Sequence, residues 1–318
     1  MPILFEKAPG KIILFGEHAV VYGQPAIAIP VTRVNATARV LPDFESDQRT
    51  IHIQALDINL DADLEDLPAE HPLGTAVRLT LEEVKPKRIP PLTLQLSSTI
   101  PLAAGMGSSA ATAVAIIRAL SSYLGKPLPP EVVSTMAYEV EKIHHGNPSG
   151  IDNNVIAHQK PVYFRREHPI EFITIEQPTH WVIADTGEKT PTRETVSAVQ
   201  QLLKSDPERF EPIIQQIGNV VQQARLALIS GDLPELGRLL DENQRLLEAL
   251  DVSSPKLDTL IDAARTAGAF GAKLSGGGRG GNMIALVSEN QITSVEHALI
   301  EAGAEKTITT ILAARKDR

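Results

Sequence analysis

The sequence predicts an α/β protein, of the α+β kind, that is built from two domains. Alternating and short apolar runs, typical of strands, occupy much of the first third of the 318 residues. Near Gln177-Pro178 the pattern changes, and after one more strand the chain becomes mostly helical up to about residue 267. It closes in the order strand, strand, helix, strand. We therefore expect a first domain at residues 1–178 and a second at 179–318.

Three strand patterns lie in the first domain. "KIILF" at 11–15 is a short apolar run, and "TIHIQALDINL" at 50–60 alternates apolar with polar residues. "LTLQL" places Leu92, Leu94 and Leu96 on one face. These patterns predict a sheet with one buried face.

Helices and a strand pair complete the first domain. Residues 110–124 and 131–145 each have a helical pattern that a glycine ends. "KPVYF" at 160–164 and "EFITI" at 171–175 are expected to pair as strands.

The second domain begins with the strand "HWVIADT" and contains an amphipathic helix over 233–250. Five leucines recur there at three- and four-residue steps, which predicts that one side of this helix is buried. They are Leu236, Leu239, Leu240, Leu247 and Leu250. "FGAKL", "NMIALV", "ITSVEHALIEAG" and "KTITTIL" then supply the closing strands and helix.

Composition excludes several classes of function. The formal net charge of −9 argues against a nucleic-acid-binding protein, which normally presents a basic face. The chain contains no cysteine, so disulfides, thiolate metal sites and cysteine nucleophiles are excluded. No run is long enough for a membrane helix, and the N-terminus lacks a signal-peptide pattern. We expect a cytoplasmic protein without a membrane or nucleic-acid partner.

"IPLAAGMGSSAATAV" at 100–114 is unusually rich in small residues where an apolar strand gives way to a helix. A helix N-terminus exposes unpaired N–H groups, and glycines such as Gly105 and Gly107 let a phosphate approach the backbone. Ser108 and Ser109 add hydroxyl groups. The alternative is a glycine turn with a serine N-cap. The spacing is not that of a Walker A loop, because no lysine follows the glycines as required.

"KLSGGGRGGN" at 273–282 holds a second glycine-rich loop. Gly276, Gly278 and Gly281 match the G-x-G-x-x-G pattern, but a strand rather than a helix follows, so a dinucleotide site is rejected. The glycines still indicate close approach to a ligand or repeated positive φ angles, with a flexible hairpin as the alternative. Arg279 either contacts a phosphate or points into water.

"EKIHHGNPSGIDNNV" joins two predicted helices. Ser149 to Asp152 has the form of a capping box, which alone would explain the aspartate. A carboxylate in a first helical turn is also held ionised and aimed between the helices. Glu141, on the preceding helix, is a hard oxygen ligand of the kind that Mg²⁺ prefers. "APGKIILFGEHAVVYG" adds Lys11, Glu17 and His18, each of which is ordinary on its own.

Taken in order, these segments resemble the GHMP kinase superfamily and, within it, the mevalonate kinase family. The segments are "PGKIILFGEHAVVYG", "GMGSSAA", "EKIHHGNPSGIDN", "IADTGEKTPTRETV" and "KLSGGGRGGN", which span nearly the whole chain. The resemblance implies a domain like ribosomal protein S5, a ferredoxin-like domain, and a cleft between them for the substrates ATP and mevalonate. It also implies transfer of the γ-phosphate to the 5-hydroxyl of (R)-mevalonate, with Mg²⁺ as cofactor.

The resemblance further assigns roles to residues. Asp152 matches the catalytic aspartate and Lys11 the lysine beside it, while Ser109 and Glu141 match the metal ligands. Substrate contacts are expected from Glu17, His18, Ser149 and Thr192. Nucleotide contacts are expected from Pro101, Ala104, Gly105, Met106, Gly107, Ser108, Ser109, Ala110, Gly276, Gly277 and Gly278.

Two departures from the family pattern are visible. The family more often has Gly-Ala-Gly at Gly276–Gly278, and a histidine is common at Gln244. Three alternatives stay open: another small-molecule kinase of the superfamily, a related ATP-dependent decarboxylase, and a ligand sensor without catalysis. The helical half is compatible with a homodimer.

Overall fold

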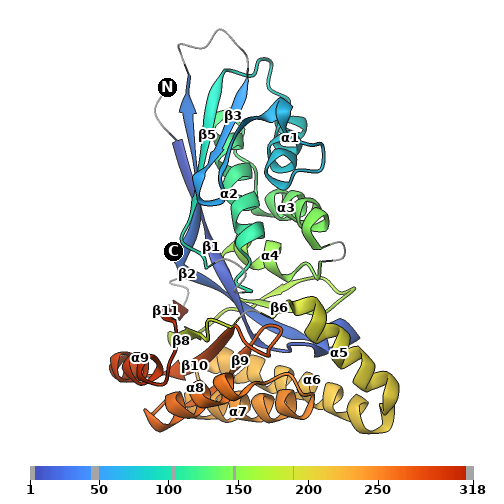
Figure 1. Cartoon of the computed structure of the whole chain (residues 1–318), viewed down its shortest axis with the longest axis vertical. Coiled ribbons are helices and arrows are strands. Elements are labelled where there is room, and N and C mark those ends of the chain that lie inside the picture. The colour runs from blue at the N-terminus through green and yellow to red at the C-terminus, as the bar shows by residue number, and fades with distance from the viewer. Residues whose placement is uncertain (1–3, 44–49, 102–104, 146–147, 189, 313–318) are drawn as a thin grey trace. The chain divides into compact units, whose positions relative to one another are not determined.

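The computed structural model describes residues 4–43, 50–101, 105–145, 148–188 and 190–312 (Figure 1). The chain forms two compact units, and neither is a single continuous segment. The first unit comprises Met1–Lys11, Val34–Leu102 and Met106–Gln159, and the second comprises Ile12–Arg33, Ala103–Gly105 and Lys160–Arg318. The boundary at 178/179 stays a prediction, since the units interleave along the chain. No helix of the described residues could cross a membrane.

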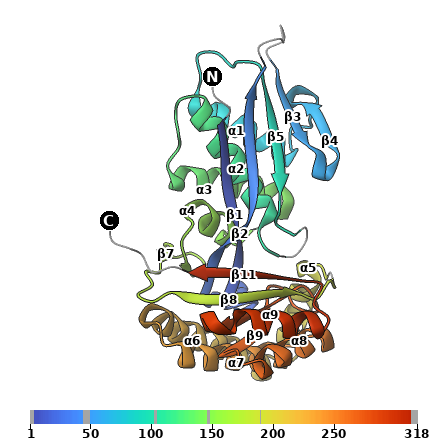
Figure 2. The same cartoon turned by 90° about the vertical axis from the view of Figure 1, so that its left-hand side faces the viewer.

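The first unit is a sheet with helices on one face (Figures 1 and 2). The strand order is β4-β3-β5-β2, in which only β3 and β5 run parallel, and β1 pairs with β2. Its strands are β1 (Leu4–Phe15), β2 (Ala26–Pro42), β3 (Ile51–Ala55), β4 (Leu60–Asp63) and β5 (Leu92–Ser98), of which β1 and β2 continue into the second unit. Leu92, Leu94 and Leu96 are all buried, as their alternation predicts.

Residues 50–60 form more than one strand, which corrects the sequence interpretation. The run breaks at a short 3₁₀ turn over Leu56–Ile58, and Asn59 adopts the left-handed conformation with φ of 56°. β3 and β4 therefore pair antiparallel across this turn. The alternation is interrupted only at the adjacent apolar residues Ala55 and Leu56 and then resumes, so the pattern gives only a weak sign that the chain reverses there.

Four helices pack in the first unit around a small-residue core. They are α1 (Pro72–Val84), α2 (Ser108–Tyr123), α3 (Pro130–His145) and α4 (Ile151–His158). α2 contacts the other three. Because α2 is rich in alanine, neighbouring helices can approach it closely, and ten of its residues are buried. This packing places α2 and α4 in one layer of helices.

The second unit contains a four-stranded antiparallel sheet in the order β11-β8-β10-β9. The strands are β8 (Thr179–Asp185), β9 (Gly271–Ser275), β10 (Asn282–Val287) and β11 (Lys306–Leu312). The closing segments form the predicted order strand, strand, helix, strand. With the helices between β8 and β9 counted as one layer, the sheet has the ferredoxin-like order that the family resemblance implies. β6 (Val162–Phe164) pairs with β7 (Glu171–Phe172) and with the start of β2, so the predicted strand pair is confirmed.

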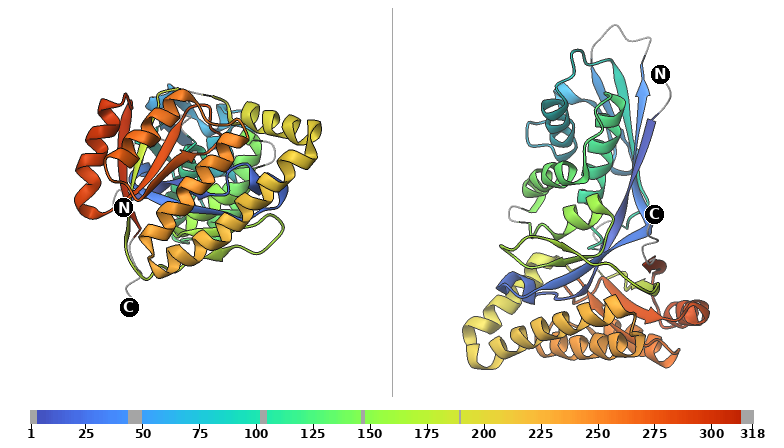
Figure 3. Two further views of the ribbon diagram at one scale, coloured as in Figure 1. Left: turned by 90° about the horizontal axis from the view of Figure 1, so that it is seen from below. Right: turned by 180° about the vertical axis from the view of Figure 1, so that it is seen from behind.

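Helices cover this second unit (Figure 3). They are α5 (Thr192–Ser205), α6 (Pro207–Ser230), α7 (Leu233–Ala249), α8 (Pro255–Thr266) and α9 (Ile292–Glu301). The five leucines of the predicted stripe on and just after α7 are each 0% exposed. α7 packs on α6 and on β9, and it therefore supports the strand that leads into the second glycine loop.

Candidate active site

Lys11 and Asp152 form an ion pair in the first unit, although 140 residues separate them in the chain. The Lys11 Nζ lies 3.0 Å from Asp152 Oδ1. The Lys11 side chain is buried, whereas the Asp152 side chain is 28% exposed and remains open to a ligand. A cation and a carboxylate thus meet at one point, as the resemblance required. Their catalytic roles stay predictions.

The start of α4 differs from the predicted capping box. Gly150, with φ of 86°, is the N-cap, and no side chain caps this end of the helix. The Ser149 hydroxyl instead accepts a hydrogen bond from the Ile151 N–H at 3.4 Å. Asp152 therefore lies in the first turn, where its negative charge interacts favourably with the helix dipole. The glycine takes the left-handed conformation that a serine N-cap could not easily adopt.

The glycine loop before α2 is joined directly to Lys11. The Lys11 N–H donates to the Met106 carbonyl oxygen at 3.0 Å. Gly107 is the N-cap of α2, with φ of 70°, and no side chain caps this helix either. The alternative of a serine N-cap is therefore wrong. Uncapped N–H groups at the start of a 16-residue helix are the arrangement that binds anions.

Gly107 lies too close to the ion pair for any side chain. A Cβ at this position would lie 2.9 Å from Ile156 Cδ1, 3.0 Å from Lys11 Cγ and 3.3 Å from Asp152 Oδ2. A glycine at this position therefore lets the glycine loop pack directly against the Lys11 side chain and the Asp152 carboxylate. Of the other predicted loop residues, Pro101, Ser108 and Ser109 are half-buried, Gly105 is exposed, Met106 and Ala110 are buried, and Ala104 lies outside the described residues.

The proposed metal ligands lie on two packed helices. Ser109 is in the first turn of α2, and Glu141 is buried near the end of α3. Together they offer a carboxylate and a hydroxyl, which are hard oxygen ligands suited to Mg²⁺. Within the described residues, no group of three or more His, Cys, Asp or Glu side chains could hold a metal by itself. A bound ion would therefore need further oxygens from phosphates or water.

In the second unit, the glycine loop lies beside Thr192. A Cβ at Gly277 would lie 3.2 Å from the Thr192 Oγ1 and 2.9 Å from the Thr195 Oγ1. Gly278, with φ of 78°, has even less room, because a Cβ there would lie 2.0 Å from the Val252 carbonyl oxygen. The departure from Gly-Ala-Gly has a physical reason here, since an alanine at 277 would displace Thr195.

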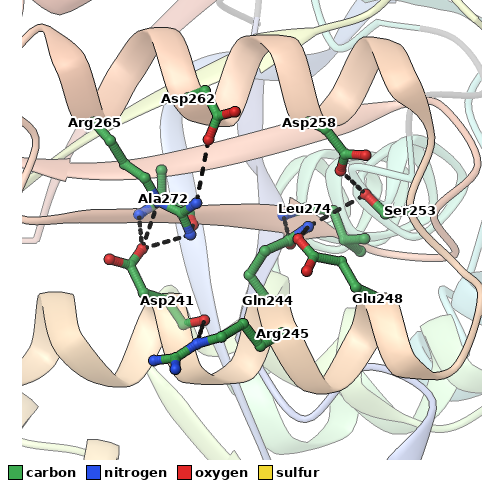
Figure 4. Close-up of polar contacts among 10 residues, drawn as sticks. All are labelled: Asp241, Gln244, Arg245, Glu248, Ser253, Asp258, Asp262, Arg265, Ala272 and Leu274. Carbon is green, nitrogen blue, oxygen red and sulfur yellow. Dashed lines mark hydrogen bonds and ion pairs between the residues drawn. The ribbon is translucent and has the colours of Figure 1, made fainter.

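Arg279 and Gln244 have structural partners. The Arg279 guanidinium pairs with the Asp251 carboxylate at 2.8 Å, so it does not simply point into water. Gln244 accepts a hydrogen bond from the Leu274 N–H at 2.9 Å, and Asp241 accepts one from the Ala272 N–H at 3.1 Å (Figure 4). Since β9 is an edge strand, these two α7 side chains satisfy N–H groups that no strand pairs.

Glu17 and His18 are also buried in the second unit. Glu17 pairs with Lys273, with 2.5 Å between Oε1 and Nζ. His18 Nε2 lies 2.9 Å from the Gly277 carbonyl oxygen, so this nitrogen carries the proton that it donates. Sequence reasoning did not find Lys273, because a lysine within a strand pattern is normally exposed.

Burial determines the charge state of His18. Desolvation is the main reason that the pKa of His18 is lowered from 6.5 to about 4. The hydrogen bond to the Gly277 carbonyl raises this pKa, and the nearby cations Arg279 and Lys273 lower it further. Between pH 4 and pH 6.5, His18 is therefore protonated more readily in the unfolded state than in the folded state. Folding stability from this group is present above pH 6.5 and is lost as the pH falls towards 4.

We expect the wild-type protein to lose stability on acidification from pH 6.5 to 4 more steeply than His18→Gln, which carries no titratable group there. Thermal unfolding at a series of pH values measures the difference. Equal pH slopes for the two proteins would show that His18 does not titrate as its buried position requires.

Comparisons with known proteins agree with this geometry. The GHMP kinases N terminal domain matches residues 72–159, and the GHMP kinases C terminal domain matches residues 224–305. A curated mevalonate kinase from Thermococcus gammatolerans is 39% identical over 327 aligned positions, which cover 96% of this chain and 95% of that protein. The chain belongs to the mevalonate kinase family of GHMP kinases. It is therefore an enzyme of the kinase class, and the two-domain fold implied by the resemblance is confirmed.

Solved structures give the same result. A crystal structure of L. major mevalonate kinase in complex with R-mevalonate has a TM-score of 0.82 at 28% identity, covering 98% of this chain and 96% of that one. The Methanococcus jannaschii mevalonate kinase has a TM-score of 0.83 at 26% identity, covering 99% of each chain. A Streptococcus pneumoniae phosphomevalonate kinase, at 18% identity and a TM-score of 0.80, shares the fold, with 96% of this chain and all of that one covered.

Proposed function

We propose that this protein transfers the γ-phosphoryl group of ATP to the 5-hydroxyl of (R)-mevalonate, giving 5-phosphomevalonate and ADP. The observation that carries the proposal is the Lys11–Asp152 pair beside an uncapped helix N-terminus, in a member of the mevalonate kinase family. In the transfer, the bond from the γ-phosphorus to the β,γ-bridging oxygen breaks and a bond to the mevalonate oxygen forms. The hydroxyl proton leaves towards Asp152, and ADP departs.

The α2 N-terminus is the part of the site suited to the nucleotide phosphates. Its N–H groups and the positive end of the helix dipole favour an anion, and Gly107 lets the anion approach the backbone. Phosphoryl transfer depends mainly on alignment and on neutralisation of charge. A helix fixed by its packing on α1, α3 and α4 provides both.

Lys11 and Asp152 act on the alcohol. The Lys11 ammonium stabilises negative charge that develops on the attacking oxygen, which makes the hydroxyl more acidic as the reaction proceeds. Asp152 orients the hydroxyl and accepts its proton late, because a carboxylate is a weak base towards an alcohol in its ground state. The exposed fraction of Asp152 leaves room for that contact.

Mg²⁺ is the cofactor that the donor set suits, with Ser109 and Glu141 as its protein ligands. When bound, the ion would neutralise phosphate charge and hold the phosphates in one orientation. Glu141→Gln keeps the shape of the side chain and removes its charge. We expect this variant to need at least tenfold more Mg²⁺ for half-maximal activity, measured by titrating MgCl₂ at fixed ATP. An unchanged Mg²⁺ requirement would remove Glu141 from the ligand set.

One assay separates this function from two of its competitors, another kinase of the superfamily and a ligand sensor. ADP release is measured with mevalonate, phosphomevalonate, galactose and homoserine at equal concentrations. We expect a kcat/KM for mevalonate at least 10²-fold above the others, since the site must lose hydrogen bonds to accept a poorer substrate. Activity with phosphomevalonate or galactose alone would favour another kinase of the superfamily. Binding of mevalonate and ATP without ADP release would favour a ligand sensor.

A cytoplasmic location and a homodimeric assembly complete the proposal. Cell fractionation and analytical ultracentrifugation, respectively, test them. A monomer at micromolar concentration would contradict the homodimer.

A further inference from the structure

Lys273 is buried as completely as any apolar core residue. Its side chain is 0% exposed. Its Nζ donates one hydrogen bond to Glu17 Oε1 and another to the Leu274 carbonyl oxygen, each at 2.5 Å. Burial raises the pKa of Glu17 and lowers that of Lys273, while the charge of each partner opposes the shift in the other. A buried ion pair of this kind adds little stability compared with apolar residues of similar size. Its presence therefore calls for another explanation.

The pair belongs to a set of contacts between β9 and residues 13–18. Lys273 and Ser275 lie on the same face of β9, since they are two residues apart. The Ser275 hydroxyl donates to the Ile13 carbonyl oxygen at 2.7 Å, and the His18 imidazole donates to the Gly277 carbonyl oxygen at 2.9 Å. Three side chains thus fix the segment that carries Glu17 and His18 against the strand and loop that follow it.

The backbone at His18 is strained. Its φ is 60° and its ψ is −48°, and the Ala19 N–H donates to the Glu17 carbonyl oxygen at 2.6 Å. This is a γ-turn of the rare form with positive φ, which an L-residue adopts at an energetic cost. Strain of this kind persists only where surrounding contacts hold it, and it places the two side chains in one defined orientation.

Two acceptor atoms remain unsatisfied in this orientation. Glu17 Oε2 and His18 Nδ1 are buried and have no well-aligned hydrogen-bond partner in the described part of the chain, although the backbone N–H groups of Glu17 and Gly276 lie near enough to lower the pKa of the Glu17 carboxyl. Because the proton of His18 lies on Nε2, its Nδ1 offers a lone pair, and Glu17 Oε2 offers another. Buried polar atoms without partners are costly, so their retention points to a ligand that supplies donors. Hydroxyl groups are such donors, whereas a carboxylate is not.

We propose that Lys273 is a positioning residue for the alcohol substrate, because it fixes Glu17 so that Glu17 Oε2 and His18 Nδ1 together accept hydrogen bonds from substrate hydroxyl groups. The inference rests on the proposed function for the identity of the alcohol. It adds Lys273 to the residues predicted for the site, and it specifies that Glu17 and His18 accept the hydrogen bonds from the substrate. Lys273 itself does not touch the substrate.

Lys273→Met tests the proposal, because methionine keeps the unbranched shape and most of the length of the side chain and removes the ammonium. KM for mevalonate is measured at saturating ATP, KM for ATP at saturating mevalonate, and thermal stability alongside. We expect the mevalonate KM to rise at least tenfold while the ATP KM changes less than threefold. An unchanged mevalonate KM, or equal increases in both constants, would overturn the positioning role.

Two further variants complete the design. Arg265→Met is the matched control, because Arg265 also pairs with a carboxylate, that of Asp241, and donates to the β9 residue Ala272 (Figure 4). It should lower thermal stability without changing the mevalonate KM. If Lys273→Met does not fold, the double variant Glu17→Gln with Lys273→Met is compared with Glu17→Gln alone. Equal mevalonate KM values are expected if Lys273 acts through Glu17, and a further increase in the double variant would overturn the positioning role. Absence of ADP release by the wild type would instead count against the proposed function.

Discussion

Asp152→Asn is expected to lower kcat by about 10²-fold or more while the affinity for nucleotide stays near the wild-type value. Asparagine keeps the shape of the side chain, and its oxygen still accepts a hydrogen bond from Lys11. What is lost is the negative charge that accepts the proton and balances the Lys11 ammonium at 3.0 Å. The nucleotide phosphates depend on the α2 N-terminus instead, so their binding should not change.

Steady-state ADP release gives kcat, and fluorescence titration with a nucleotide analogue gives the affinity. Asp206→Asn is the matched control, because Asp206 is also an aspartate at a helix start, where it caps α6 by accepting from the Arg209 N–H. Asparagine caps helices as well as aspartate does, so this control should retain full activity. Near-normal turnover by Asp152→Asn would refute both the base and the orienting role.

The candidate site combines features that local sequence patterns could and could not predict. A glycine-rich segment before a helix is visible in a short window, and so the glycine turn and the helix start at residues 105–110 were predictable. The contact between Lys11 and Asp152 was not, because no periodicity relates positions so far apart. Only the family resemblance placed them together, and the distance of 3.0 Å agrees with it.

Two elements of the fold escaped prediction for physical reasons. β2 contains Pro30, which usually argues against a central strand. The pairing of β2 with β6 and β5 covers residues 26–28 and 36–42, so these ladders omit the proline. α1 carries Gly74 and several residues with weak helix preference, and its packing on α2 and α3 stabilises it instead.

Lys273 illustrates the same limit within the second unit. The run "FGAKL" correctly predicts a strand, yet the pattern gives a lysine no reason to be buried. Its partner Glu17 is 256 positions away in the sequence. Distant partners of this kind decide whether a charged side chain can be buried. The Glu17–Lys273 pair could therefore be identified only from the folded structure.

Gly107→Ala is expected to lower kcat/KM by about 10²-fold or more. The residue has a φ of 70°, and the added Cβ would press on the Lys11 side chain and on Asp152 Oδ2 at once. The glycine loop, the cation and the carboxylate would therefore have to move apart. Displacements of about 1 Å at reacting groups cost about this factor. The loss should appear in kcat as well as in the KM for ATP, because both depend on this residue.

Gly125→Ala separates this effect from ordinary backbone strain. Gly125 follows the other end of α2, has a φ of 80°, and a Cβ there would meet nothing within 4 Å. It should lose stability of about 1 kcal/mol and keep its activity, since only the conformational cost of positive φ applies. Thermal unfolding and steady-state kinetics on both variants give the comparison. Equal loss of activity in the two would mean that strain in α2, rather than contact with Lys11 and Asp152, explains why position 107 is a glycine.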